Sequence, residues 1–252
     1  MSTTNVLITG ANRGVGLALT KIYLLRSNQI VIGGVRDVAA AKAGPLGSLP
    51  TATGTKLVLV KIDALSHTDP AQAVQELESQ GITKLNVVIA NSGIVGKEVV
   101  SVADSDPADF AEVLAVNTIG PVVLFKAVKK LLDRSENPRY IAISSTVGSS
   151  VLQPKSVNGT QPIGFGYGAS KAALNHITRH MHSENPGITV AAVSPGFMNT
   201  DMGNRGAKTF GLEKPPHDVD ENAQQIVKLV DVVTREKHSG QFLDFDGSEL
   251  EW

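Results

Sequence analysis

The sequence predicts a single α/β domain over residues 1–252, in which helices flank one doubly wound parallel sheet of about seven strands. Three observations predict it. Short β-branched runs alternate with longer segments in which apolar residues recur at helical spacing. The short runs are apolar at nearly every position, as parallel strands buried on both faces are. No linker, repeat or low-complexity tract divides the 252 residues, a length that suits one large domain.

The expected elements follow from these runs in chain order. The strands are the seven short apolar runs, Val6–Thr9, Ile30–Val35, Leu57–Ile62, Asn86–Ala90, Tyr140–Ser144, Thr189–Val193 and Phe242–Phe245. The helices lie between them, at 15–26, 68–80, 107–134, 167–184 and 221–235. In the last helix, apolar residues recur three and four positions apart from Ile226 to Val233. Strands that alternate with helices through short connections favour a doubly wound sheet.

Two segments do not fit this pattern. Gly148–Gly166 and Gly203–Asp220 are rich in glycine, proline and polar residues and have no periodicity. Irregular segments of this length in a compact domain are usually functional lids or mobile segments. Tolerated surface insertions are the alternative interpretation.

Composition excludes several classes of protein. The chain has no cysteine, which excludes disulfides, a thiol nucleophile and cysteine-ligated metal. Its net charge of −1 argues against charge-driven binding to nucleic acid or an anionic membrane. Met1–Asn5 has no basic stretch before an apolar segment, and no apolar run approaches the roughly 20 residues that span a bilayer. We therefore expect a soluble, cytoplasmic protein without nucleic-acid or membrane partners.

The first expected strand ends in a glycine-rich turn. Residues 9–16 have the sequence TGANRGVG, and a helix follows at once. Glycines there let backbone N–H groups at the helix N-terminus approach a pyrophosphate, whose charge the helix dipole favours. This arrangement predicts a Rossmann-type, dinucleotide-binding domain. The cofactor-binding candidates in this turn are Gly10, Asn12, Arg13, Gly14, Val15 and Gly16.

The end of the second strand distinguishes the two common dinucleotides. Proteins that bind NAD place an acidic residue there for the ribose 2′-hydroxyl, whereas a 2′-phosphate needs a cation. Val35 aligns with the acidic position and is followed by Arg36, and Arg13 supplies a second guanidinium. Two planar cations suit a phosphate, so we expect NADPH (NADP+). Asp37 leaves NAD open if the alignment is displaced by two residues.

Tyr167 and Lys171 open the helix at 167–184. Residues four apart share a helix face, so the phenol and the ammonium point into one site, where the ammonium would lower the pKa of the tyrosine. Such a pair can move a hydroxyl proton. Upstream, Ser144 and Ser145 end a strand at the edge of the sheet where ligands of α/β proteins bind.

Together these motifs resemble those of the short-chain dehydrogenase/reductase family over nearly the whole chain. The shared residues are Thr9–Gly16, Asp63, Ala90–Gly93, Asn117, Ser145, Tyr167, Lys171 and Pro195–Gly196. Residues 195–202 and the tail 240–252 are most similar to those of small carbonyl reductases of the sniffer and norsolorinic acid ketoreductase kind. The family usually has Asn-Asn-Ala-Gly where this chain has Ala90–Gly93. The stretch from Ser145 to Tyr167 is also longer than usual, so we expect it to form a loop near the substrate.

The resemblance implies a catalytic role for four residues. Tyr167 would donate a proton to the substrate carbonyl oxygen, and Ser145 would orient that oxygen. Lys171 would lower the pKa of the tyrosine and bind the nicotinamide ribose. Asn117 would hold a water that connects Lys171 to solvent.

The resemblance also implies contacts with the cofactor. Asp63 would contact the adenine and Asn91 the adjoining ribose, while Met198 and Thr200 would fix the carboxamide. The remaining expected contacts are Gly93, Pro195 and the residues named above in the glycine turn.

The function expected from this resemblance is an NADPH-dependent carbonyl reductase that acts on an aromatic or polyketide-like substrate as a homodimer or homotetramer. An NAD-dependent alcohol dehydrogenase and a non-catalytic NADPH sensor remain as alternatives. Phe165, Phe197 and Phe210 either wall an apolar substrate pocket or anchor the two irregular segments.

We expect no metal site. His176, His180 and His182 lie on the tyrosine helix, and histidines four apart can bind metal. His176 is five positions past Lys171, however, which turns it about 140° away around the helix axis.

Overall fold

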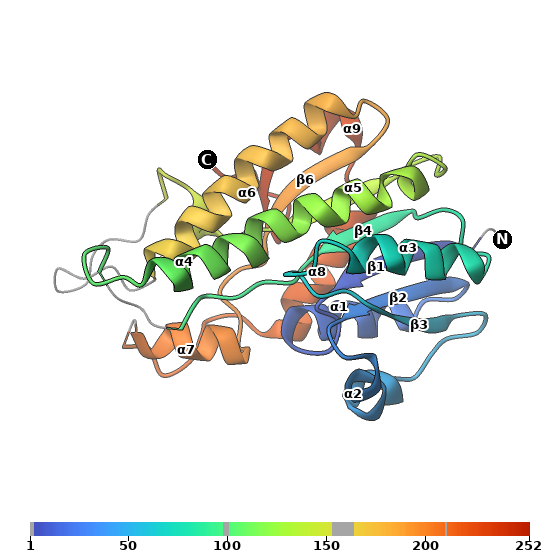
Figure 1. Ribbon diagram of the computed structural model, residues 1–252, viewed down its shortest axis with the longest axis horizontal. Helices are drawn as coiled ribbons and strands as arrows, with labels where there is room; N and C mark the ends of the chain where they lie inside the picture. Colours follow the sequence, from blue (N-terminus) through green and yellow to red (C-terminus); the bar gives the residue numbers. More distant parts are fainter. Residues whose placement is uncertain (1–2, 98–100, 153–163, 210) are drawn as a thin grey trace.

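A computed structural model describes residues 3–97, 101–152, 164–209 and 211–252 (Figure 1). Its centre is one seven-stranded sheet in the order β3-β2-β1-β4-β5-β6-β7, with every neighbouring pair parallel. The strands are β1 Thr4–Thr9, β2 Gln29–Val35, β3 Lys56–Lys61, β4 Val87–Ala90, β5 Arg139–Ile143, β6 Thr189–Ser194 and β7 Phe242–Asp244. The predicted fold class is confirmed.

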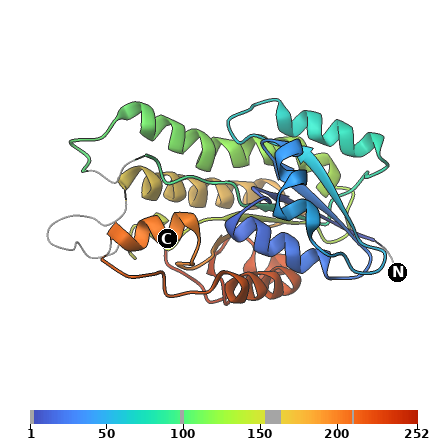
Figure 2. The same cartoon turned by 90° about the horizontal axis from the view of Figure 1, so that it is seen from below.

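Helices cover both faces of the sheet, as Figure 2 shows. One face carries α1 (Gly14–Leu24) and α8 (Val219–Val232), which pack against each other. The other carries α3 (Asp69–Ser79), α5 (Gly120–Leu132) and α6 (Phe165–Glu184). α4 (Pro107–Leu114) continues into α5 through a π-helical turn, Ala115–Ile119. The short elements are α2 Val38–Ala43, α7 Asp201–Thr209, α9 Arg235–His238 and the 3₁₀ turns η1 Pro45–Ser48 and η3 Thr146–Gly148.

The strands are buried on both faces. In β1, Val6 and Ile8 belong to the core shared with α1 and α8, whereas Leu7 belongs to the core shared with α3 and α5. Successive side chains of a strand point to opposite faces, so an unbroken apolar run supplies both cores. This is the physical reason why the strands were recognisable from sequence.

The order of the strands positions the site. β1 pairs with β2 on one side and with β4 on the other, so the chain reverses its direction of winding between β1 and β4. In open α/β sheets, ligands bind in the crevice at the carboxyl ends of the strands beside such a switch point. Most of the predicted site residues follow these strand ends.

The segment Gly203–Asp220, expected to be irregular, is partly helical. α7 spans Asp201–Thr209, and the Thr200 hydroxyl caps it by accepting a hydrogen bond from the Gly203 N–H at 3.1 Å. The helix has two glycines and only one buried residue, Ala207, so its sequence lacks the apolar periodicity that predicts a helix. α2, which was not expected either, is capped by Asp37. Most of the other irregular segment, at 153–163, lies outside the described residues.

Among the described residues, one helical segment, Pro107–Leu132, is long and apolar enough by composition to cross a membrane. The expectation that no apolar run approaches this length was therefore wrong. Leu124, Val128 and Leu131 of this segment are buried against the sheet. Its apolar character is that of a helix with one face in the core.

Candidate functional site

The glycine turn forms the N-terminus of α1. Gly10 and Gly14 have φ angles of +66° and +52°, which side-chain-bearing residues rarely adopt. A Cβ at Gly16 would lie 2.2 Å from the Gly10 carbonyl oxygen, so only glycine fits there. No side chain in the described ranges caps α1, and its first turn holds no acidic residue. The free N–H groups and the helix dipole therefore suit a pyrophosphate, and the predicted residues fit a dinucleotide.

Two exposed arginines lie near this turn. Arg13 directly precedes α1, and Arg36 follows β2; neither forms an ion pair with any described residue. Asp37, the alternative ligand for an NAD ribose, accepts a hydrogen bond from the Ala40 N–H at 2.9 Å and caps α2. Arg36 at the end of β2 and Arg13 in the glycine turn are therefore available to a phosphate, whereas the Asp37 carboxylate is used to cap α2.

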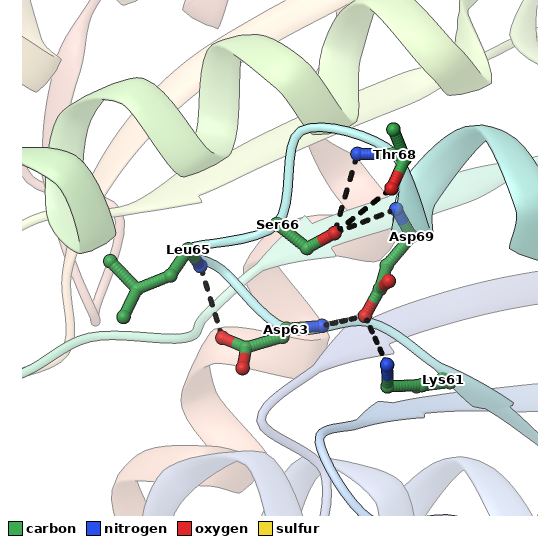
Figure 3. A network of polar contacts seen from close by, with 6 residues as sticks. All are labelled: Lys61, Asp63, Leu65, Ser66, Thr68 and Asp69. Carbon is green, nitrogen blue, oxygen red and sulfur yellow. Dashed lines mark hydrogen bonds and ion pairs between the residues drawn. The ribbon is translucent and has the colours of Figure 1, made fainter.

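Asp63 is held at the end of β3 by a polar network (Figure 3). Its carboxylate accepts the Leu65 N–H at 3.0 Å, and its own N–H donates to Asp69 at 3.2 Å. Asp69 is buried and pairs with Lys61 at 3.4 Å. Burial by itself would raise the pKa of Asp69, but hydrogen bonds from Ser66, the Asp63 N–H and Lys61 lower it. The network fixes the backbone of the residue expected to meet the adenine.

The end of β4 is tied to the end of β1. The N–H groups of Asn91 and Ser92 donate to the Thr9 hydroxyl at 3.0 and 3.1 Å, and the Asn91 amide donates to the Thr9 carbonyl at 2.9 Å. A Cβ at Gly93 would lie 3.6 Å from the Lys171 ammonium. The departure from the family pattern at Ala90–Gly93 therefore leaves the backbone close to the site.

Ser145, Tyr167 and Lys171 converge beside the end of β5. Lys171 is 3% exposed; its ammonium donates to the Ile143 carbonyl at 2.7 Å and lies 5.7 Å from the centre of the Tyr167 ring. Burial lowers the pKa of Lys171 to about 8. Burial raises the pKa of Tyr167 to about 12, while a hydrogen bond with Ser145 lowers it. The expectation that Lys171 brings the tyrosine pKa below its usual value was wrong here, because desolvation of the phenolate dominates.

Asn117 lies in the π-helical turn and is fully buried. Its amide donates to the Ile94 carbonyl at 2.8 Å and to the Ser170 hydroxyl at 2.9 Å, and its oxygen accepts the Ile94 N–H at 2.9 Å. The Asn117 amide thus holds the loop after β4 through Ile94 and contacts α6 through Ser170. The water relay expected of Asn117 stays a prediction.

The turn after β6 closes the site. Asn222 donates to the Pro195 carbonyl at 2.9 Å, and Gly196 has a φ of +83°. Met198 is buried, and the methyl group of Thr200 would lie 3.6 Å from a Cβ at Gly14. This brings the residues expected at the carboxamide beside the glycine turn.

Two residues that hold site residues in place were not expected from the sequence. Ser170, within the Tyr-x-x-x-Lys motif, joins Asn117 to the Tyr167 carbonyl. Its place directly before Lys171 was a usable signal. Asn222 acts on Pro195 from α8, and its position in the sequence carries no such signal.

The aromatic residues of the irregular segments divide between the two interpretations. Phe165 packs against Phe110 with ring centres 5.1 Å apart, and both line a cavity of about 230 Å³ beside the start of α6. Phe197 contacts α7 at Gly206, which fits an anchoring role. Phe210 lies outside the described residues.

The histidines take structural positions. His180 pairs with Glu184 at 3.6 Å, and His182 hydrogen-bonds Ser239 at 2.7 Å. Within the described ranges, no group of three histidine, aspartate or glutamate side chains could hold a metal ion.

Comparison with known proteins supports these observations. The family described as short chain dehydrogenase matches residues 4–209. A norsolorinic acid ketoreductase of Dothistroma septosporum is 35% identical over 254 residues, which covers 99% of this chain and 92% of the relative. The NADPH-bound carbonyl reductase from chicken fatty liver has a TM-score of 0.81 at 27% identity, and the carbonyl reductase Sniffer of D. melanogaster one of 0.79 at 23%; each comparison covers both chains in full. The expected resemblance to small ketoreductases is confirmed, in the case of Sniffer at the level of the fold.

Proposed function

This chain belongs to the short-chain dehydrogenase family, and from that premise we propose that it is an NADPH-dependent carbonyl reductase. The observation that carries the proposal is the convergence of Ser145, Tyr167 and Lys171 at the end of β5, in a chain whose α1 N-terminus is capped by no described side chain. A hydroxyl pair and a buried cation at that place suit proton transfer to a carbonyl oxygen.

NADPH, when bound, supplies the hydride that goes to the carbonyl carbon. The Ser145 hydroxyl orients the carbonyl oxygen, and the Tyr167 hydroxyl donates the proton that this oxygen takes up. With a pKa of about 12, the phenol is protonated at neutral pH, as a proton donor must be. Lys171 stabilises the phenolate that remains. The carbonyl gains one hydride and one proton and becomes an alcohol.

The preference for NADPH is supported by the guanidinium groups of Arg13 and Arg36, which are exposed and form no ion pair with the described residues, and by the capping role of Asp37. A 2′-phosphate gains charge-assisted hydrogen bonds from two arginines, whereas a 2′-hydroxyl gains little from them. The carbonyl reductase from chicken fatty liver, 27% identical, binds NADPH.

We further propose an aromatic or polyketide-like substrate. The Phe110–Phe165 pair gives the cavity at the start of α6 an aromatic wall, and a relative at 35% identity is a norsolorinic acid ketoreductase. We also propose that the protein forms a homodimer or homotetramer and is located in the cytoplasm. The exposed apolar side chains of Ile119 and Val122 on the α4–α5 segment are available to an interface.

The first experiment follows NADPH and NADH oxidation in parallel against a panel of aldehydes, ketones and quinones. We expect turnover with NADPH that Tyr167→Phe reduces at least about 100-fold, the size of a general-acid contribution. Unchanged rates in Tyr167→Phe would refute the assignment of the acid. Tight NADPH binding without turnover on any carbonyl would favour a sensor, and a preference for NADH would refute the cofactor assignment.

A further inference from the structure

Three side chains of α6, four residues apart, lie along one face of the helix at the end of β5: Tyr167, Lys171 and Asn175. Tyr167 contacts Ser145 just beyond the strand, and Lys171 donates to the carbonyl of the strand's last residue, Ile143. The proposed reaction uses the first two side chains. It assigns no role to the third, Asn175.

Asn175 makes its contact at the residue before Ser145. The Ser144 hydroxyl donates to the Asn175 amide oxygen at 2.5 Å, and the two residues are only 1% and 2% exposed. The amide nitrogen of Asn175 is buried and has no hydrogen-bond partner among the described residues. A buried amide with an unmet donor costs free energy that an apolar side chain would not, so packing alone does not account for asparagine at this position.

Ser144 directly precedes Ser145 and the turn η3 that follows it. Its N–H donates to the Val193 carbonyl at 2.7 Å, which ties it to the neighbouring strand β6. Ser145 follows, leaves the sheet and caps the turn η3. Gly148 ends this turn so close to α6 that an added Cβ would lie 2.8 Å from the Lys171 backbone. Ser144 is thus held by the sheet on one side and by Asn175 of α6 on the other.

We propose that Asn175 is a positioning residue: by holding Ser144, it sets the place of the Ser145 hydroxyl relative to the Tyr167 hydroxyl. It contacts neither reacting atoms nor cofactor. Its effect on turnover rests on the function proposed above, whereas its effect on the Ser145–Tyr167 contact does not. Small displacements of reacting groups cost large factors in rate, so a single buried hydrogen bond here matters.

The kinetic test is a double-mutant cycle with Asn175→Leu, which keeps similar volume and removes the hydrogen bond. We expect kcat to fall about tenfold, with the KM for NADPH changed by less than about twofold. In a Ser145→Ala background, the same substitution should change kcat by less than about twofold, because its target is gone. An equal loss in both backgrounds would overturn the proposal.

Thr178→Val is the matched control. Thr178 is fully buried on the same helix, but its hydroxyl donates to the Leu174 carbonyl within α6 and not to β5. We expect its kcat to equal that of the unsubstituted chain. A loss like that of Asn175→Leu would mean that any polar deletion in α6 has this effect, and would also overturn the proposal.

A second readout needs no turnover. The chain has three tyrosines, so labelling with ¹³Cζ-tyrosine gives three NMR signals, and the one absent in Tyr167→Phe belongs to Tyr167. We expect Asn175→Leu to move this signal in the same direction as Ser145→Ala, and Thr178→Val to leave it in place. An unmoved signal in Asn175→Leu would overturn the proposal. Absence of turnover in the unsubstituted chain would count against the proposed function alone.

If Asn175→Leu does not fold, Ser144→Ala takes its place in both measurements. It removes the same hydrogen bond from the strand side, where the side chain is smaller. The expected displacement of the Tyr167 signal has the same sign, and no displacement would overturn the proposal.

Discussion

At the scale of single residues, burial decides the charge states of the two groups at the centre of the site. It raises the pKa of Tyr167 to about 12 and lowers that of Lys171 to about 8. Both shifts disfavour the charged form, as desolvation must. The phenol is therefore protonated at neutral pH, while the ammonium is close to its own titration. A donor of this kind suits reduction better than oxidation.

The pH dependence of reduction follows from the Lys171 pKa. The rate should be constant below pH 7 and fall as pH rises through about 8, approaching about tenfold per pH unit, because a neutral amine does not stabilise the phenolate left by proton transfer. The measurement is kcat/KM for a carbonyl substrate between pH 5.5 and 9.5. In Lys171→Met the rate should be low throughout, without this descending limb. A wild-type limb that begins above pH 10 would contradict the assignment.

Cofactor choice is also decided by single side chains. Arg36→Ala should raise the KM for NADPH about tenfold or more and leave that for NADH nearly unchanged, because only the 2′-phosphate loses a charge-assisted hydrogen bond. Steady-state kinetics with both cofactors checks this. Arg134→Ala, an exposed arginine that pairs with Glu78, is the control and should change neither value. Equal losses for NADPH and NADH would exclude Arg36 as a phosphate ligand.

At the scale of elements, two helices differ from their sequence pattern in instructive ways. The apolar pattern at 107–134 predicts one helix, and the structure has one from Pro107 to Leu132, but with a widened π turn that carries Asn117. α7 has almost no apolar pattern and forms nonetheless, because a cap at Thr200 and a close contact with the turn after β6 stabilise it. The periodicity of apolar residues reflects burial against the core. It therefore indicates neither the π turn within the long helix nor α7, which is stabilised at its end.

Because of that close contact, a side chain at position 203 should affect activity. A Cβ there would lie 1.9 Å from the Met198 carbonyl oxygen, so Gly203→Ala must displace α7 from the turn expected to hold the carboxamide. We expect kcat/KM to fall about tenfold or more, with a small change in Tm because α7 contributes one buried residue to the fold.

Gly206→Ala is the control for this prediction. Its Cβ would meet only the Phe197 ring, at 3.5 Å, and alanine favours a helix by about 1 kcal/mol over glycine. Activity should be kept and Tm unchanged or raised. If both substitutions had the same effect on kcat/KM, the proximity of α7 to Met198 would not be what matters.

At the scale of the whole molecule, the C-terminal tail covers one of the two edges of the sheet, that of β7. The Leu250 N–H donates to the Phe242 carbonyl of β7 at 2.8 Å, and Trp252 stacks on the Phe242 ring with centres 5.6 Å apart. The Arg179 guanidinium of α6 lies 5.2 Å from the Trp252 ring. An unpaired strand edge invites association with other chains, and the tail reduces that exposure.

Trp252→Ala should therefore lower stability. Losing the ring stacking and the cation–π contact should cost about 1–2 kcal/mol, which lowers Tm by a few degrees for a domain of this size. Thermal unfolding measures this, and light scattering tests whether the substituted chain associates more. Glu251→Ala, at the exposed neighbouring position, should leave both unchanged. A Tm equal to that of the unsubstituted chain would mean that the tail does not stabilise the edge.

The sequence by itself determined the strands, the larger helices, the dinucleotide turn at Gly10–Gly16 and the pairing of Tyr167 with Lys171. These follow from local rules: side-chain periodicity, the φ angles open to glycine, and the four-residue spacing of a helix face. Only the tertiary structure decided which strand ends and which helix meet, so that Asn91 is tied to Thr9 and Asn175 of α6 to Ser144. It also decided the sign of the Tyr167 pKa shift, because the desolvation of a buried phenol depends on everything packed around it and not on its neighbours in the chain.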